Sequence, residues 1–595
     1  MSRFCAIVLI LSLIATASKV SAAEPLADIE GDVPKELGVS ISRVLGEVEA
    51  APRSMSQARR RGAKAKASAL SVLRSEGYYG AEVSVLIPRA LDTQIKASAS
   101  RQPRLTIIPG VQFRFKNMAI NYDGQALDQA KALAKALSAA LPIKDGDPAL
   151  ALSVVRAEAA IVTALRQAGY PEAIALKRKA VVDHDSKTLS VTFNIAPGDK
   201  TRFGEIRLTR DTKVSESWIK IVSPAKPGAL ADVRQLDALS SRLISTQAFA
   251  GVVSSLSDDP KPNADGTVTR DIVLNIDTGK KNTVSAEIGV STTDGTGVDV
   301  VYTRRNLRRR GETLKLTSTA KTNLLSLGAD YHIPYAWSVH RALDLGVQIA
   351  REDTEAFSGE RVTTKALMSR EVNERLKFSA GIGLEVSQFE EDDQNIRAYL
   401  VEGLGRVYYD ARNSIVDPSK GYLLDVNATP TYNFGQSDGL FTTIETAASA
   451  YQRLSDSLVF AGRAKSGTIL GASTDSVPLN RRYYGGGGGS VRGYGYQTIS
   501  PSDIDGDLIG GRSLAEAGAE LRYRGKSAFG FVAFVDAGSV SSTDLPNFDE
   551  VLVGAGLGLR YYTSFAPIRA DIAIPLNKRE GDNAFQIYIS IGQAF

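Results

Sequence analysis

The feature that most constrains the fold is a two-residue period in the hydrophobic pattern of the C-terminal half. Apolar residues alternate with polar or small ones in 284–291 and again in 585–595, where Gln593 is the one polar residue on the apolar side. This alternation is typical of strands with lipid outside and a hydrated lumen inside. Because no long apolar helix follows residue 23, a position in a membrane requires a closed barrel, which satisfies every backbone group.

Short alternating runs fill the region between these two segments. They include residues 314–319 and 515–523, and Gly, Asn and Asp turns separate them. At about 20 residues per strand and connection, the roughly 315 residues hold about 16 strands, an even number as bacterial barrels require. We therefore expect a 16-stranded antiparallel transmembrane β-barrel over residues 280–595. A soluble β-sandwich or propeller is the alternative, but it does not explain an aromatic chain end inside the final strand.

The N-terminal half contains an internal repeat in which a helical period is followed by strand alternation. One copy has an apolar helical stripe, a stop at Gly169-Tyr170-Pro171, an alternating run over 189–195 and a Pro197-Gly198 turn. The residues of the stripe are Val154, Val155, Ile161, Val162, Leu165 and Ala168.

An earlier copy has a helix with Leu70 and Leu73, then Gly77-Tyr78 and a Pro109-Gly110 turn. A third and fainter copy runs through residues 243–276. The spacing of about 80 to 90 residues predicts three α+β domains with the order β-α-α-β-β. We place these domains at residues 24–110, 111–198 and 199–279.

Residues 1–23 have the pattern of a secretory signal peptide. Arg3 supplies a positive charge, an apolar run extends from Phe4 to Ala17, and small residues near Ala23 offer a cleavage site. The apolar run is shorter than the roughly 20 residues that span a membrane, so we expect cleavage rather than an anchor. The only cysteine, Cys5, lies in this segment, so we expect a mature chain without thiols.

The composition argues against several functional classes. The formal net charge is +5, from 71 Lys and Arg against 66 Asp and Glu. This nearly neutral balance does not indicate a nucleic-acid-binding protein. None of the 3 histidines has a second histidine at metal-ligand spacing. No Ser-His-acid set or acid pair is recognisable. We expect no catalytic residue, metal, cofactor or nucleic-acid partner, and hence no enzyme.

The most specific motif is a glycine run at 485–489 followed by Ser490 and Val491-Arg492-Gly493-Tyr494. Downstream lies Phe534-Val535-Asp536-Ala537-Gly538. Weaker motifs accompany these two: Asn306-Leu307 with Gly311-Glu312, Asp417-Pro418-Ser419-Lys420-Gly421-Tyr422, Gly510-Gly511, Pro567-Ile568-Arg569 and Ile591-Gly592-Gln593-Ala594-Phe595. In this order the motifs resemble the POTRA-plus-barrel superfamily of outer-membrane assembly proteins. The size and the three repeats look most like its TamA branch, the outer-membrane subunits of translocation and assembly modules.

The resemblance implies that the glycine-rich loop folds back into the barrel, where Arg492 pairs with Asp536. A guanidinium offers a carboxylate a two-pronged hydrogen bond, and a charged side chain in a narrow lumen needs a counter-ion. The plain alternatives are an exposed arginine on a surface loop and an aspartate that binds only water. We assign the lumen loop motif to Val491, Arg492, Gly493 and Tyr494. We assign the counter-ion strand motif to Phe534, Asp536 and Gly538.

The resemblance also implies a location and a function. The barrel is expected in the bacterial outer membrane, with the POTRA domains in the periplasm. The protein is expected to insert autotransporters and other β-barrel proteins through strand addition to POTRA sheet edges and a lateral barrel seam. Expected partners are unfolded outer-membrane protein clients, outer-membrane lipid, and a TamB-like inner-membrane-anchored protein that spans the periplasm. The alternatives are a two-partner secretion pore for one dedicated substrate and a passive porin or receptor.

Three further features lead to predictions about the barrel seam, the insertion of the barrel and the docking of a partner. Gly289 and Gly592 lie on the first and last strands, where they either weaken a lateral seam or merely relieve crowding in the lumen. Phe595, the terminal aromatic residue, is the expected insertion signal. Arg59-Arg60-Arg61 forms a basic cluster that is either a solvated helix face or a docking patch for an acidic partner.

Overall fold

The computed structural model describes most of the chain. The described residues are 24–48, 52, 54–88, 102–122, 141–209, 213–291, 295–391, 394–435, 438–525, 527–563, 566–591 and 593–594. The expected signal peptide, residues 1–23, lies outside them, as do Gly592 and Phe595. The chain forms two compact units. The first comprises Met1–Glu205, Ala225–Leu236 and Leu256–Ile272, and the second comprises Ile206–Pro224, Asp237–Ser255 and Val273–Phe595.

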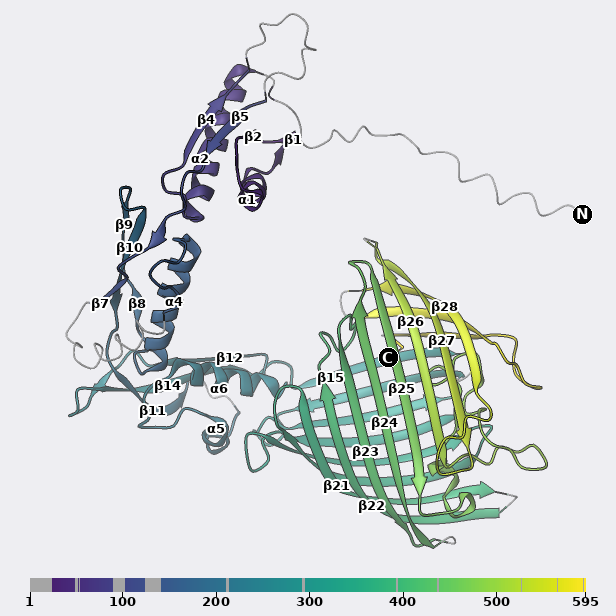
Figure 1. Cartoon of the computed structure of the whole chain (residues 1–595). Helices are drawn as coiled ribbons and strands as arrows, with labels where there is room; N and C mark the ends of the chain where they lie inside the picture. Colours follow the sequence, from purple (N-terminus) through teal and green to yellow (C-terminus); the bar gives the residue numbers. More distant parts are fainter. Residues whose placement is uncertain are drawn as a thin grey trace, which may run out of the picture. The chain divides into compact units, whose positions relative to one another are not determined.

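The first POTRA-like domain packs two helices on a three-stranded sheet (Figure 1). Its elements are β1 (Glu24–Pro25), β2 (Asp28–Glu30), α1 (Lys35–Leu45), β3 (Glu47–Val48), α2 (Met55–Ser75), β4 (Glu82–Leu86) and β5 (Arg104–Ile108). In the sheet, β2 is parallel to β5 and β4 is antiparallel to it. The side chain of Ser54 caps α2 by accepting the backbone N–H of Gln57 at 3.2 Å. An added Cβ on Gly62 of α2 would lie 2.7 Å from Val85, so this helix lies close against β4.

The second POTRA-like domain has a similar plan around a central strand, β10. Its elements are β6 (Arg114–Phe115), β7 (Ala119–Tyr122), α4 (Ala151–Gln167), β8 (Ile174–Ala175), β9 (Lys179–Asp183) and β10 (Thr188–Ala196). Strand β10 is parallel to β6 and β7 and antiparallel to β8 and β9. The sequence alternation predicts one buried face for β10, and the buried residues are Leu189, Val191, Phe193 and Ile195.

Helix α4 differs in one respect from the expected apolar stripe. It buries Val154, Ile161 and Leu165 together with Ala157. The expected stripe includes Val155, but this residue is 47% exposed, so that part of the prediction is wrong. Successive residues point about 100° apart around an α-helix, and Val155 therefore lies outside the face that Val154 helps to define.

A repeated joint connects the successive domains. Gly77 and Gly169 follow the long helices α2 and α4 and have φ values of +85° and +99°, a conformation that favours glycine. The carbonyl of Gly77 accepts the N–H of Phe113 at 2.9 Å, and the carbonyl of Gly169 accepts the N–H of Thr201 at 2.8 Å. The repeated Gly-Tyr pair of the sequence therefore marks the place where the next domain begins.

The third POTRA-like domain contributes residues to both compact units. Its elements are β11 (Thr201–Leu208), α5 (Glu216–Val222), α6 (Val233–Ser245), β12 (Gly251–Leu256), β13 (Lys261–Pro262) and β14 (Val268–Asp277). The sheet order is β11-β14-β12, and β13 also pairs with β14. Within the described residues, none of the helices is long and apolar enough to cross a membrane.

The second unit contains a closed barrel of sixteen antiparallel strands, which confirms the predicted fold (Figure 1). Its strands are β15 (Asn282–Ser291), β16 (Gly295–Arg305), β17 (Thr313–Lys321), β18 (Leu324–Ile333), β19 (Arg341–Asp353), β20 (Ser358–Glu371), β21 (Leu376–Glu391), β22 (Gln394–Asp410), β23 (Gly421–Asn433), β24 (Gly439–Arg453), β25 (Leu458–Leu470), β26 (Ser513–Arg524), β27 (Phe529–Ser541), β28 (Leu552–Tyr562), β29 (Pro567–Pro575) and β30 (Gln586–Ile591).

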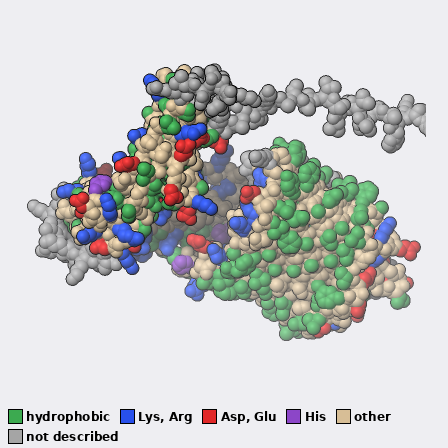
Figure 2. Space-filling model, turned by 45° about the horizontal axis from the view of Figure 1, so that its top comes forward, with side chains coloured by type: hydrophobic (Ala, Val, Ile, Leu, Met, Phe, Trp, Pro, Cys, Tyr) green, Lys and Arg blue, Asp and Glu red, His purple; other side chains and the backbone are tan. Residues whose placement is uncertain are grey.

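The outward-facing residues of the barrel are largely apolar. On β19, for example, Leu345, Val347 and Ile349 alternate along the strand and are 39%, 43% and 56% exposed. Figure 2 shows hydrophobic side chains over most of the barrel face that is turned to the viewer. An outward apolar band of this kind matches the hydrocarbon region of a membrane.

Within the second unit, residues before α5 and in α6 contact two turns between barrel strands. Asn306, in the turn between β16 and β17, donates its side-chain amide to the carbonyl of Lys213 at 2.8 Å. Tyr335, between β18 and β19, donates its hydroxyl to the carbonyl of Arg242 at 2.8 Å. The Asn306-Leu307 motif therefore lies where this helical segment docks on the barrel.

Candidate functional site in the barrel lumen

The connection between β25 and β26, residues 471–512, is folded and deeply buried at its tip. Short antiparallel bridges fold it on itself. Val491 and Tyr494 are 0% exposed and Arg492 is 1% exposed. A buried arginine is stable only when it is paired and hydrogen-bonded, so the contacts of Arg492 define the site.

Arg492 lies within hydrogen-bond distance of three buried carboxylates. Its Nε is 2.6 Å from Oδ2 of Asp536 and its Nη2 is 3.2 Å from Oδ1, which makes a two-pronged contact. Its Nη1 is 2.8 Å from Oε1 of Glu520 and 3.2 Å from Oδ2 of Asp571. The guanidinium carbon lies 3.5 Å from the centroid of the Phe534 ring. The structure thus brings Arg492 and Asp536 together and adds two acids that the sequence motif does not include.

Three further arginines offset the charge of these carboxylates. The pairs are Arg522 with Glu520 at 2.7 Å, Arg463 with Asp536 at 3.4 Å, and Arg560 with Asp571. Each carboxylate therefore contacts two guanidinium groups, the second being that of the loop arginine. Alternating opposite charges compensate for the loss of water around each of them.

The three residues of the strand motif on β27 each have a different role in binding the loop. Phe534, Asp536 and Gly538 are two residues apart, so all three face the lumen. Phe534 stacks on the guanidinium and Asp536 pairs with it. An added Cβ on Gly538 would lie 2.6 Å from Val491, and one on Gly554 of β28 would lie 1.8 Å from the carbonyl oxygen of the loop arginine. Glycine at these positions therefore makes room for the loop tip.

The loop tip also contacts the last strand and the connection before it. Gly493, with φ +108°, donates its N–H to the hydroxyl of Tyr588 on β30 at 3.0 Å. Tyr494 donates its hydroxyl to Oδ1 of Asn577, between β29 and β30, at 2.8 Å. The four motif residues of the loop therefore link β27 to the final hairpin of the barrel.

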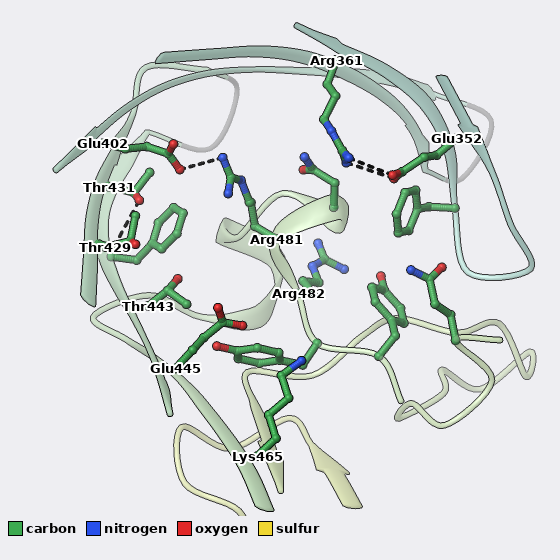
Figure 3. Close-up of a pocket in the computed structure, with 16 residues that line it drawn as sticks. Glu352, Arg361, Glu402, Thr429, Thr431, Thr443, Glu445, Lys465, Arg481 and Arg482 are labelled. Carbon is green, nitrogen blue, oxygen red and sulfur yellow. Dashed lines mark hydrogen bonds and ion pairs between the residues drawn. The ribbon is translucent and has the colours of Figure 1, made fainter. Parts of the chain in front are cut away.

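A second ion cluster anchors the same loop nearer to its start. Nη2 of Arg481 lies 2.7 Å from Oε2 of Glu385 and 2.6 Å from Oε1 of Glu402, on β21 and β22. Figure 3 shows Arg481 and Glu402 beside a cavity of about 340 Å³ with mostly polar walls. This anchor was not predicted from the sequence. Its only signal is that each acid alternates with outward apolar residues such as Leu384 and Val401, which places it on the lumen side.

The seam between the first and last strands is short in the part of the chain that the structure describes. There, residues 290–291 of β15 pair with residues 588–589 of β30. By comparison, β15 pairs with β16 at ten positions and β30 pairs with β29 at six. An added Cβ on Gly289 would meet no described atom within 4 Å. Gly592 and Phe595, the other residues expected here, lie outside the described residues.

Known proteins resemble this chain in sequence. The Omp85 superfamily domain matches residues 278–595. Outer membrane protein assembly factor BamA of Nitratidesulfovibrio vulgaris is 24% identical over 506 residues, which cover 81% of this chain and 62% of that protein. BamA of Neisseria meningitidis serogroup B is 21% identical over 575 residues, which cover 85% of this chain and 70% of that protein. The chain therefore spans about two thirds of the length of these relatives.

One solved structure supports the same fold. The crystal structure of BamA from Haemophilus ducreyi lacking POTRA domains 1–3 has a TM-score of 0.67 at 18% identity, and the match covers 80% of this chain and 100% of that one. The superfamily match covers more than half of the 595 residues and coincides with the barrel that holds the Arg492 loop. With a sixteen-stranded barrel behind POTRA-like domains and a matching barrel sequence, the chain belongs to the Omp85 superfamily.

Proposed function

We propose that this protein inserts β-barrel proteins, autotransporters among them, into the bacterial outer membrane, and that the seam between β15 and β30 is the gate. As an Omp85 superfamily member it lies in that membrane, with its POTRA-like domains in the periplasm. The observation that carries the proposal is the short pairing between β15 and β30 among the described residues.

A short seam lowers the cost of opening the barrel wall. Each backbone hydrogen bond contributes about 0.5 to 1.5 kcal/mol to stability. Among the described residues, the two paired positions between β15 and β30 therefore hold these strands together less firmly than the ten between β15 and β16. Opening exposes the edge of β15, where an extended client can pair through main-chain hydrogen bonds. Such pairing demands little of the client sequence, which suits a protein with varied clients.

The POTRA-like domains offer further places for strand addition. Strand β4 lies at one edge of the first sheet and β12 at one edge of the third. An extended client can add to such an edge by the same main-chain hydrogen bonds before it reaches the barrel. We infer that these edges receive clients and that the seam completes their insertion.

Photo-crosslinking in cells tests this proposal. A photoreactive residue in place of Ile587, which faces outward on β30, should capture unfolded β-barrel clients because the client strand pairs beside it. The matched control is the same probe at Val347 on β19, since the two side chains are 38% and 43% exposed. Equal capture at both positions would contradict a gate at the seam.

Two other outcomes would favour the alternative functions. If a probe in the lumen, such as one at the buried residue Thr431, captured only a water-soluble passenger, a two-partner secretion pore would be the better description. Large and steady single-channel conductance would favour a passive porin. An assembly factor whose lumen holds a buried loop should conduct little.

The basic face of α2 supports a partner-binding role for the first POTRA-like domain. This helix contains no acidic residue, and Arg59, Arg60, Lys64 and Lys66 are exposed on it. Arg60 and Lys64 are four residues apart, and like charges at this spacing destabilise a helix by about 0.2 to 0.5 kcal/mol. The cluster therefore does not serve the stability of the helix. We infer that it binds an acidic segment of a TamB-like protein that spans the periplasm.

Charge reversal on this face should weaken that interaction. We expect Arg60→Glu with Lys64→Glu to lower the amount of TamB-like protein that co-purifies about tenfold, because repulsion replaces attraction at the docking surface. The matched control is Lys177→Glu with Lys179→Glu, two exposed positions of the second POTRA-like domain. Unchanged co-purification at low salt would identify the cluster as a solvated helix face.

A further inference from the structure

The turn between β22 and β23, residues 411–420, is held rigid by its own hydrogen bonds. Oδ1 of Asn413 accepts the N–H groups of Ser419 and Lys420 at 3.0 and 2.9 Å. Gly421 ends the turn with φ +97°, and an added Cβ there would lie 2.1 Å from a backbone carbonyl oxygen at its start. The Asp-Pro-Ser-Lys-Gly-Tyr motif of the sequence begins in this turn. Because the turn is rigid, the position of the aspartate is fixed.

That aspartate, Asp417, binds a residue near the end of the chain. Nε2 of Gln593 donates to Oδ1 of Asp417 at 2.9 Å, and Oε1 of Gln593 accepts from Nε of Arg560 at 3.1 Å. Arg560 is 0% exposed, so this contact lies inside the barrel. Strand β30 ends at Ile591, which faces outward, and continued alternation would point Gln593 into lipid. The one polar residue on the apolar side of the final segment is therefore turned inward.

These contacts continue into the lumen site. Arg560 pairs with Asp571, and Nη1 of Arg492 lies 3.2 Å from the same carboxylate. The buried loop, the barrel wall and Gln593 are thus joined through alternating charged and polar groups. On its other side, Oδ2 of Asp417 lies 3.3 Å from Nη1 of Arg524 at the end of β26.

We propose that Asp417 and Gln593 form a latch: it holds Gln593, which follows β30, inside the barrel and so anchors β30 beside β15, which keeps the seam closed. Opening the seam requires β30 to move away from β15, and this movement breaks the hydrogen bonds of Gln593 to Asp417 and Arg560. Asp417 and Gln593 are positioning residues, because they act on the seam through β30 and need not touch the client. The latch rests on the proposed gate but adds a specific pair of residues that controls it.

Hydrogen–deuterium exchange of the full chain in lipid nanodiscs tests the latch. Gln593→Glu removes the hydrogen bond that Nε2 donates to Asp417 and places a second carboxylate there, whereas the contact with Arg560 is kept. We expect exchange at the backbone amides of residues 586–591 to rise about tenfold, because a charge-assisted hydrogen bond is replaced by repulsion. Exchange in β21, far along the barrel sequence from the seam, should not change. A matched control is Gln452→Glu, because the amide of this exposed residue contacts the neighbouring backbone carbonyl of Arg453.

A second substitution separates a direct contact from general destabilisation. Gln593→Glu combined with Asp417→Asn restores a donor–acceptor pair, since the new amide can donate to the new carboxylate. We expect exchange at residues 586–591 to return close to that of the unaltered chain. If the two residues only stabilised the barrel in general, the two substitutions would each raise exchange, and the double variant would exchange faster than either single variant.

The latch and the gate can fail separately. If exchange at residues 586–591 is the same in Gln593→Glu and in the unaltered chain, or if Asp417→Asn gives no rescue, the latch is wrong whatever the clients do. If exchange rises and is rescued while the rate of client insertion stays constant, the latch stands and the proposed gate is wrong.

Discussion

A disulfide between positions 290 and 589 is expected to abolish client assembly, and reduction should restore it. These positions face each other in the register of β15 and β30. Directly opposite residues of antiparallel strands have Cα atoms about 4.5 to 5.5 Å apart, within the range that a disulfide spans. A covalent bond at this place prevents the two strands from separating. The variant Val290→Cys with Ile589→Cys can be assayed for insertion of a β-barrel client before and after reduction, and Cys5 is the only natural cysteine.

The matched control places the same bond elsewhere in the barrel. Val347 and Thr364 face each other on β19 and β20, so Val347→Cys with Thr364→Cys forms an equivalent bond away from the seam. This variant should keep full activity when oxidised. Full activity in a completely oxidised seam variant would rule out the gate and would leave the POTRA-like domains as the place where clients are handled.

The fold could be predicted because its signals are local. In β30, Ile587 and Ile589 are 38% and 47% exposed, whereas Gln586 and Tyr588 are 1% and 2% exposed. This difference follows directly from the period of two residues in the sequence. The failure at Val155 shows the limit of such patterns. Hydrophobicity alone does not decide which residues at the edge of a helical stripe are covered by the neighbouring sheet.

The site could be predicted only in part because its contacts join distant segments. The spacing of the β27 motif places Asp536 on the lumen face, and the pairing with Arg492 was expected from resemblance to a family rather than from the pattern itself. Glu520 and Asp571 lie 28 and 79 residues from Arg492 in the sequence, and no local pattern links them to it. Gln593 was visible only as an exception to an alternation. Its partners depend on barrel closure, which brings the turn after β22 to the end of β30.

Replacing Arg492 with alanine is expected to leave the barrel in the membrane and to reduce client assembly at least about tenfold. A tenfold change corresponds to a free-energy difference of about 1.4 kcal/mol. The substitution removes one cationic partner from each of three carboxylates whose side chains are 0% exposed: Asp536, Glu520 and Asp571. Breaking a buried ion pair costs about 3 to 5 kcal/mol, which is enough to free the loop tip from β27. The strands themselves remain hydrogen-bonded to one another, so outer-membrane levels of the protein should stay near normal.

A charge exchange is a weak test of this contact. Arg492→Asp with Asp536→Arg should recover only part of the activity, because the new carboxylate on the loop would face Glu520 and Asp571, which both contact the natural arginine. Arg492→Lys should also be intermediate. It keeps the charge but loses the two-pronged hydrogen bond and the stacking on Phe534.

A double-mutant cycle with Asp536→Ala is the sharper test. The free energy of unfolding in urea should show a coupling of at least about 0.5 kcal/mol between the two positions, as residues in direct contact do. The matched control is the Arg406–Asp425 pair, which is also two-pronged, at 2.8 and 2.7 Å, but has an arginine side chain that is 41% exposed. Exposed pairs contribute about 0 to 1 kcal/mol, so Arg406→Ala should leave client assembly nearly unchanged. Coupling near zero between Arg492 and Asp536 would mean that other contacts of the loop, such as Arg481 with Glu385 and Glu402, hold it in the lumen.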